Sequence, residues 1–112
     1  MIKDYFKQLN VALTVCDENG IILYMNDKAA WTFMKDGGYD LIGKNLLDCH
    51  PEPAKSTLTK MLMTHETNSY TIEKNGVKKL IYQVPRFEDE VFKGYAELSL
   101  EVPFEMPHFI RK

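Results

Sequence analysis

The chain contains the segment DENGIILYMNDKAA at residues 17–30 and the shorter segment LIGKN at residues 41–45. In the first segment an Asn19-Gly20 pair lies next to β-branched apolar residues. Such a pair favours a two-residue type I′ turn, because both of its residues tolerate a positive φ. The pattern therefore predicts a hairpin of two strands, residues 11–16 and 20–25, followed by a helix whose N-cap is Asn26 or Asp27.

The remainder of the chain predicts a second helix and then three strands. Apolar residues at helical spacing favour a helix at residues 54–65. Alternating apolar and polar residues predict strands at residues 68–74, 77–84 and 94–102, with an Asn75-Gly76 turn between the first two. The segment 85–93 is expected to be a loop. In the last strand we expect Tyr95, Glu97, Ser99 and Glu101 to lie on an exposed face of the sheet.

The order of these elements, together with two motifs, resembles the PAS domain family. Segment 17–30 resembles a motif common in that family, which consists of an aspartate, a glycine, an isoleucine, an asparagine and a pair of alanines. A segment like LIGKN usually follows this motif. The resemblance implies an α+β fold over residues 11–102: a five-stranded antiparallel sheet with short helices on one face, enclosing a small cavity. Residues 1–10 are expected to form an N-terminal cap helix, with apolar positions from Ile2 to Leu9. Residues 103–112 are expected to be a tail.

The resemblance also implies a function. A PAS-type sensory module binds a small ligand or cofactor in its cavity and signals through a homodimer or a partner protein, for example in the regulation of transcription. Two alternatives stay open. The first is a ligand-free module for dimerisation or protein interaction, and the second is a haem-binding PAS domain.

The candidate ligand-binding residues follow from where the resemblance places the cavity. His50 and Cys49 come shortly after the LIGKN step, where PAS helices form the cavity wall, and His50 is the expected metal ligand if haem is bound. The other candidates are soft or aromatic side chains suited to a pocket wall: Trp31, Met34, Met61 and Tyr82. The ordinary alternative is that His50 is a surface residue and that the other candidates belong to the core. Trp31 is the exception, because it lies off the apolar stripe of its helix and is expected to face a partner or a ligand entrance.

The cofactor is unknown from the sequence, with haem as the one named candidate. Flavin photochemistry is disfavoured. Photoreactive PAS domains resemble one another in an Asn-Cys-Arg-Phe-Leu-Gln sequence directly after the Gly-Lys step, whereas this chain continues with NLLD at residues 45–48. The cysteine comes later, and the arginine and glutamine of that motif are missing.

Composition excludes several other classes of protein. A length of 112 residues fits one domain, and the net charge of −2 comes without a dense run of lysine and arginine, which argues against direct nucleic-acid binding. The sequence lacks a phosphate loop, a nucleophile elbow and a catalytic histidine set, so we do not expect an enzyme. The two cysteines lack the spacing of a zinc site. No apolar stretch approaches a membrane span, and we expect a cytoplasmic protein.

Overall fold

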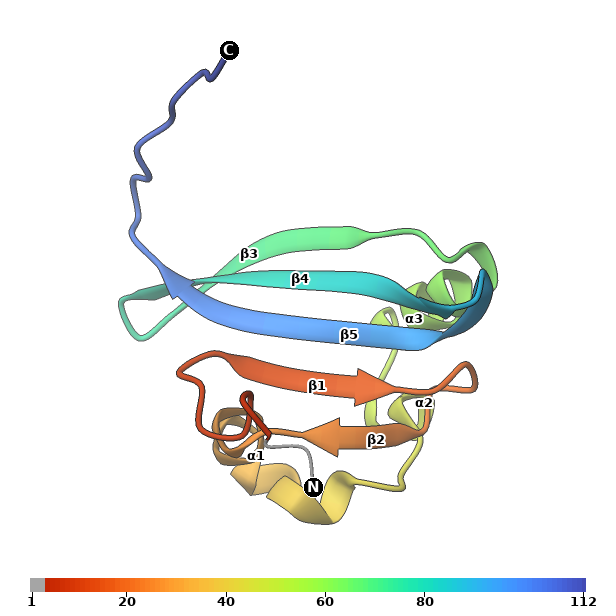
Figure 1. Cartoon of the computed structure of the whole chain (residues 1–112). Coiled ribbons are helices and arrows are strands. Elements are labelled where there is room, and N and C mark those ends of the chain that lie inside the picture. The colour runs from red at the N-terminus through yellow and green to blue at the C-terminus, as the bar shows by residue number, and fades with distance from the viewer. Residues whose placement is uncertain (1–3) are drawn as a thin grey trace.

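The computed structural model describes residues 4–112 and shows five antiparallel strands in one sheet (Figure 1). The strands are β1 (Ala12–Cys16), β2 (Ile22–Met25), β3 (Asn68–Lys74), β4 (Val77–Glu88) and β5 (Val91–Val102), in the spatial order β2-β1-β5-β4-β3. The helices are α1 (Asp27–Thr32), α2 (Leu46–Cys49) and α3 (Ala54–Thr64), with short 3-10 turns η1 (Met34–Asp36) and η2 (Gly38–Leu41) after α1. The predicted α+β class, with short helices and a five-stranded antiparallel sheet, is confirmed. Within residues 4–112, no helix is long and apolar enough to cross a membrane.

The turn between β1 and β2 differs from the predicted type I′ turn. Gly20 has a φ of 87°, whereas Asn19 does not have a positive φ. The Gly20 N–H donates to the Asp17 carbonyl at 3.0 Å, and the Asp17 N–H donates to the Ile21 carbonyl at 2.9 Å. This is the pattern of a three-residue loop, a type I turn closed by glycine. The Asp17 carboxylate selects it by accepting from the N–H groups of Asn19 and Ile21, each at 2.9 Å. The other Asn-Gly pair, at Asn75 and Gly76, does have positive φ at both residues.

The predicted loop at residues 85–93 is mostly strand. β4 continues to Glu88, and β5 begins at Val91 after a two-residue turn at Asp89 and Glu90, both at positive φ. The prolines and acidic residues of this segment suggested a break. Pro85 is tolerated because the first residue of β3, Asn68, lies opposite Gln83. Beyond Gln83, β4 therefore pairs only with β5.

The LIGKN segment returns to the first hairpin and pairs with its turn. The Gly43 N–H donates to the Ile22 carbonyl at 2.8 Å, and the Ile22 N–H donates to the Lys44 carbonyl at 2.9 Å. The Leu46 N–H then donates to the Gly20 carbonyl at 2.9 Å. The two motifs that carried the resemblance are therefore hydrogen-bonded to each other, and this pairing sets where α2 begins.

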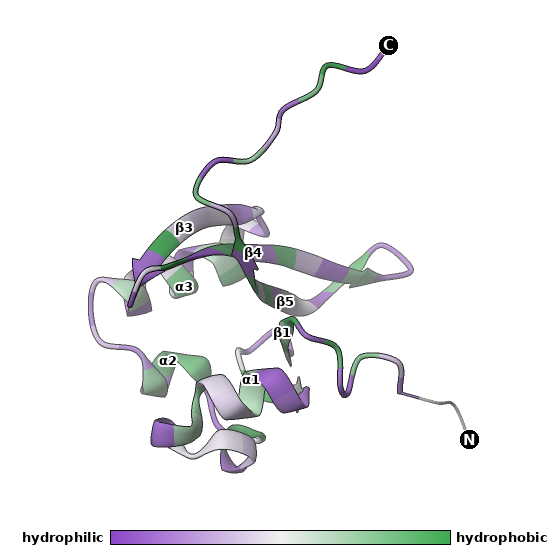
Figure 2. Cartoon of the chain, turned by 90° about the vertical axis from the view of Figure 1, so that its left-hand side faces the viewer, coloured by the Kyte–Doolittle hydropathy of each residue, from purple (hydrophilic) through white to green (hydrophobic). Residues whose placement is uncertain are grey.

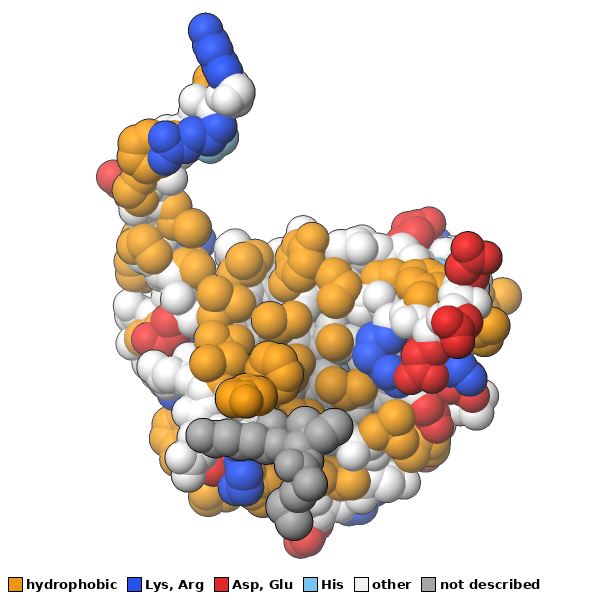
Figure 3. All heavy atoms as spheres, in the orientation of Figure 1, with side chains coloured by type: hydrophobic (Ala, Val, Ile, Leu, Met, Phe, Trp, Pro, Cys, Tyr) orange, Lys and Arg blue, Asp and Glu red, His pale blue; other side chains and the backbone are white. Residues whose placement is uncertain are grey.

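The two faces of the sheet are covered differently. In Figure 2, α2 and α3 lie on one side of the strands and the N-terminal segment lies on the other. Tyr95 and Glu97 lie on the inner, helix-covered face, which corrects the prediction of an exposed face. The opposite, outer face carries apolar residues in register, which Figure 3 shows gathered over the strands: Leu13, Val15, Leu80, Tyr82, Val84, Ala96, Leu98, Leu100 and Val102.

Residues 4–10 and 103–112 do not belong to the sheet. Residues 5–8 form a turn rather than the predicted helix, and Ile2, where that helix was to begin, lies outside the described residues. The turn is attached to the domain, because the Lys7 ammonium pairs with the Asp27 carboxylate at 2.9 Å. The tail after β5 is extended and projects away from the sheet (Figure 1), with Phe104, Met106, Phe109 and Ile110 exposed.

Candidate functional site

A cavity of about 320 Å³ lies between the inner face of the sheet and the helices. Its floor comes from β1, β4 and β5, and its walls come from α2, α3 and the segment that follows α1. The lining is mainly apolar, and its members are Thr14, Cys16, Gly20, Ile22, Met25, Phe33, Asp36, Leu41, Lys44, Leu46, Leu47, Cys49, His50, Leu58, Met61, Leu62, Gln83, Tyr95 and Glu97. An apolar pocket with a few convergent polar groups is the usual form of a small-molecule site.

Three of the six predicted ligand-binding residues line this cavity: His50, Cys49 and Met61. Cys49 ends α2, and His50 follows as the C-cap of that short helix. The His50 Nδ1 atom lies 2.8 Å from the Leu46 carbonyl oxygen, which fixes the ring against α2. When Nδ1 carries the proton and donates to this carbonyl, Nε2 is left as an acceptor. Met61 is buried on α3 and faces the floor.

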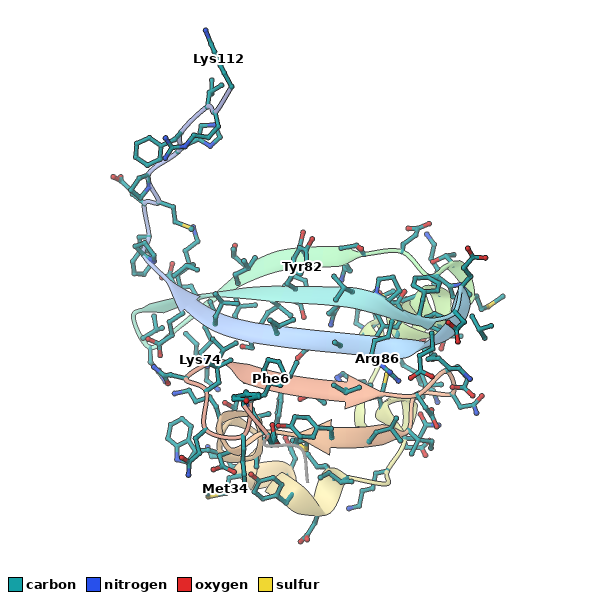
Figure 4. The ribbon with its side chains drawn as sticks, in the orientation of Figure 1. Phe6, Met34, Lys74, Tyr82, Arg86 and Lys112 are labelled. Carbon is teal, nitrogen blue, oxygen red and sulfur yellow. The ribbon has the colours of Figure 1, made fainter. Side chains whose placement is uncertain are left out.

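The other three predicted residues lie elsewhere. Trp31 and Met34 are exposed, and the Lys28 ammonium lies 5.2 Å from the centre of the Trp31 ring. Tyr82 projects from the outer face of β4, and Figure 4 shows it and Met34 far apart. These residues were chosen because soft or aromatic side chains suit a pocket wall, but residue type does not tell which side of an element the cavity is on.

Two polar residues of the floor, Gln83 and Glu97, were not predicted as site residues. Thr14, Gln83 and Glu97 line the cavity from three neighbouring strands, with Glu97 opposite both Thr14 and Gln83 in register. The Gln83 Nε2 group donates to the Glu97 carboxylate at 2.7 Å. The available signal was Glu97, a polar residue in the middle of a predicted strand, which we assigned to an exposed face rather than to a covered one.

Tyr95 fastens the α3 wall to the floor. Its hydroxyl lies 2.8 Å from the carbonyl oxygens of both Met61 and Glu66, so its single proton is shared between the last turns of α3 and the segment beyond it. Burial raises the pKa of the Tyr95 phenol, which keeps the hydroxyl a donor. Just past α3, the His65 ring stacks on Phe92 of β5, with ring centroids 3.7 Å apart. These contacts hold α3 to the sheet at its C-terminal end.

The two cysteines should differ in reactivity. Cys16 is only 3% exposed, and burial raises the pKa of its thiol, whereas Cys49 is exposed at the cavity rim. Because the thiolate is the reactive form, we expect Ellman's reagent at pH 8 to modify one thiol per folded chain and two in about 8 M urea. The control is Cys49→Ser, which should leave no rapidly reacting thiol. Rapid modification of two thiols in the folded protein would contradict this assignment.

The fold and the cavity define a small α+β domain in which a five-stranded antiparallel sheet and short helices enclose an apolar pocket. A comparison with protein families matches residues 6–79 to the family described as the PAS fold. The match spans well over half of the chain, and the chain belongs to the PAS family. A comparison with curated protein sequences finds no match.

Several solved structures share this fold. One is the Aer2 receptor from Vibrio cholerae, described as a dual PAS-heme oxygen sensor, with a TM-score of 0.58 and 18% identity over 83% of this chain and 95% of that chain. A second is the PAS domain of BvgS from Bordetella pertussis, with a TM-score of 0.64 and 16% identity over 87% and 80% of the two chains. A third is the PAS domain of the histidine kinase ThkA, with a TM-score of 0.61 and 17% identity over 81% and 98%. The first of these structures is of a receptor and the third is from a histidine kinase.

Proposed function

We propose that this PAS domain senses a small molecule that binds in the cavity behind the sheet. The observation that carries the proposal is the cavity itself: about 320 Å³, mostly apolar, and closed on one side by a polar floor. This volume lies at the lower end of the range of roughly 300–1,000 Å³ found for small-molecule sites. His50, Cys49 and Met61 are the predicted ligand contacts that fit it. The proposal is of a binding module and not of an enzyme.

The signal would leave the domain through the elements that the ligand touches. α3 contributes Leu58, Met61 and Leu62 to the wall and is fastened to β5 through Tyr95. A ligand that binds better to one position of α3 shifts the population toward that position. The projecting apolar tail, which continues from β5, and the N-terminal segment are the proposed transmitters to a partner.

A dimerisation or interaction module is the second candidate, and the outer face of the sheet favours it. That face is apolar from β1 to β4, and soluble monomers seldom leave so continuous an apolar surface open to water. The proposal places the interface on this face, because the inner face is occupied by the helices and the cavity. Signalling through a homodimer is compatible with a ligand in the cavity.

Haem is the remaining candidate, with His50 as the residue that would hold the iron. The described lining fits this group poorly. Haem carries two carboxylates that need cationic partners, but the lining offers one lysine, the exposed Lys44, against the carboxylates of Asp36 and Glu97. Within residues 4–112, no group of three or more histidine, cysteine or acidic side chains could hold a bare metal ion.

Native mass spectrometry of the purified domain tests the proposal that a small molecule binds in the cavity. We expect a small added mass that disappears in Leu58→Trp, which fills the cavity, and persists in Thr59→Trp, its exposed neighbour on α3. The same spectra give the oligomeric state, and an absorption spectrum of the sample should lack a Soret band.

Three outcomes separate the candidates. If neither added mass nor a shift in melting temperature appears after incubation with a metabolite library, the ligand proposal fails and the interaction module stands. A dimer that becomes a monomer in Leu98→Glu would support the outer face as the interface. A Soret band that is lost in His50→Ala would instead establish haem. Circular dichroism of each variant checks that it is folded.

A further inference from the structure

A row of polar side chains crosses the floor of the cavity and ends at a carboxylate. In register across the sheet, Asn68 lies opposite Gln83, Gln83 opposite Glu97, and Glu97 opposite Thr14. The Asn68 Nδ2 group donates to Gln83 Oε1 at 2.9 Å, and the Gln83 Nε2 group donates to Glu97 Oε2 at 2.7 Å. Both amides therefore present their donors in the direction of Glu97, and the glutamate side chain is held in one orientation.

Gln83 gives this arrangement its rigidity. Its side chain is only 9% exposed, and both of its polar ends are used, one as acceptor and one as donor. A buried amide with both ends satisfied has little freedom to turn, since turning would leave buried polar atoms without partners. The carboxylate of Glu97 is thus supported by a fixed neighbour rather than by mobile surface groups.

The charge of Glu97 is not neutralised by the protein. Among residues 4–112 the only ion pair joins Lys7 to Asp27, and neither of these residues lines the cavity. Glu97 is half-buried, and its Oε1 atom makes no hydrogen bond within the same residues. The one lysine in the lining, Lys44, is exposed at the rim. A partly buried carboxylate with a free oxygen and no cation is best satisfied by a cation that enters from outside.

The surroundings of Glu97 define the rest of the ligand. Met61 and Leu62 of α3 line the same cavity and offer an apolar wall facing the polar floor, in which Tyr95 lies two residues before Glu97 on β5. We infer that the ligand is a small organic cation, a primary amine or guanidinium with an apolar body. Its charged end pairs with Glu97, oriented by Gln83, and its apolar body packs against α3. This inference rests on the proposed function and specifies its ligand class.

The other classes of ligand match the cavity less well. The lining contains two carboxylates, Asp36 and Glu97, against one ammonium group, so an anion entering the cavity meets a net negative charge. A neutral apolar molecule would fill the space but leave the carboxylate without a partner. The volume of about 320 Å³ also limits the ligand to a small body.

Titrations followed by nuclear magnetic resonance of ¹⁵N-labelled protein test this inference at pH 7. The probes are phenethylamine, 2-phenylethanol and 3-phenylpropionate, which share one ring and differ in the charge of the chain end. We expect phenethylamine to bind about tenfold or more tightly than 2-phenylethanol, with shifts at Gln83 and Tyr95. In Glu97→Gln, which keeps a polar group of the same size, this preference should disappear. In Glu101→Gln, with the same change in net charge on an exposed part of β5, it should persist.

Each other outcome has a definite meaning. If 2-phenylethanol or 3-phenylpropionate binds as tightly as phenethylamine and shifts the same cavity residues, the cation inference is overturned while the cavity remains a ligand site. If Glu97→Gln binds phenethylamine as the unchanged protein does, Glu97 is not the partner and the inference is also overturned. The absence of cavity shifts with all three probes overturns it as well, and native mass spectrometry then decides the proposed function separately. The spectrum of each variant without probe shows whether it is folded.

Discussion

Replacing Asn26 with alanine is expected to lower the free energy of unfolding by about 3–5 kcal/mol. The side chain is completely buried, and all of its hydrogen-bonding capacity is used. Its Nδ2 group donates to the carbonyls of Phe6 and Val11 at 2.9 and 2.7 Å. Its Oδ1 atom accepts from the N–H groups of Leu13 and Ala29, each at 3.0 Å. The substitution therefore removes four hydrogen bonds. The Phe6 carbonyl keeps the Leu9 N–H as a donor, whereas the Val11, Leu13 and Ala29 groups lose this partner. An unsatisfied buried group costs about 1–3 kcal/mol.

The matched control for this prediction is Asn45→Ala. Asn45 is also an N-cap: its side chain accepts from the Leu47 N–H at 2.9 Å and donates to the Asn19 carbonyl at 3.1 Å. It is only partly buried, so water can replace these bonds and the expected cost is about 1 kcal/mol. Urea denaturation of the two variants measures the difference. Equal losses of stability would show that Asn26 contributes to stability only by capping α1, and not through its four hydrogen bonds.

Replacing Gly94 with alanine is expected to be at least as damaging, with a loss of about 4 kcal/mol or more. Gly94 has a φ of 127°, a conformation open almost only to glycine. A Cβ atom at this position would lie 2.0 Å from the Cys16 carbonyl oxygen and 2.6 Å from the Asp17 carbonyl carbon. Both are backbone atoms of the adjacent chain segment, so relief requires β1 and β5 to separate. The same Cys16 carbonyl accepts from Arg86 at 3.1 Å (Figure 4 labels Arg86), and that bond would be disturbed too.

The control for Gly94→Ala is Gly76→Ala. Gly76 also has a positive φ, 78°, but no atom lies within 4 Å of the position that a Cβ would take. The added methyl group thus meets only backbone strain, and we expect a loss of about 1–2 kcal/mol. Urea denaturation again gives both values. If the two variants were equally stable, the close approach of β5 to residues 16 and 17 would not constrain the fold.

The sequence predicted the elements of this fold well because the signals for them are local. Apolar alternation located the strands, and the Asn75-Gly76 turn has both predicted positive φ angles. The N-cap at Asn26 or Asp27 was confirmed at Asn26, whose side chain accepts from the Ala29 N–H. The errors were also local. Asp17, two residues before Asn19, selected a different turn. Pro85 was interpreted as the end of a strand, but β4 tolerates a proline there because it no longer pairs with β3.

The candidate site was predicted only where a motif pointed to it. His50 and Cys49 were found because they follow the LIGKN step, and Met61 because it lies on the apolar stripe of α3. Trp31, Met34 and Tyr82 do not line the cavity, because residue type alone carries no information about direction. Glu97 was assigned to the wrong face. Alternation separates the two faces of a strand but does not indicate which one the helices cover.

For this chain, local chemistry in the sequence was enough to establish the order of the elements and the family resemblance. Turn residues, caps and periodicity act within a few residues, so they can be read without knowledge of distant contacts. Contacts between segments far apart in the chain decided the cavity and its polar floor. Gly43 to Leu46 return to pair with the first hairpin, and β1, β5 and β4 bring Thr14, Glu97 and Gln83 side by side. The carboxylate that a ligand meets on the floor is therefore placed by the pairing of β1 with β5, two strands separated by most of the chain.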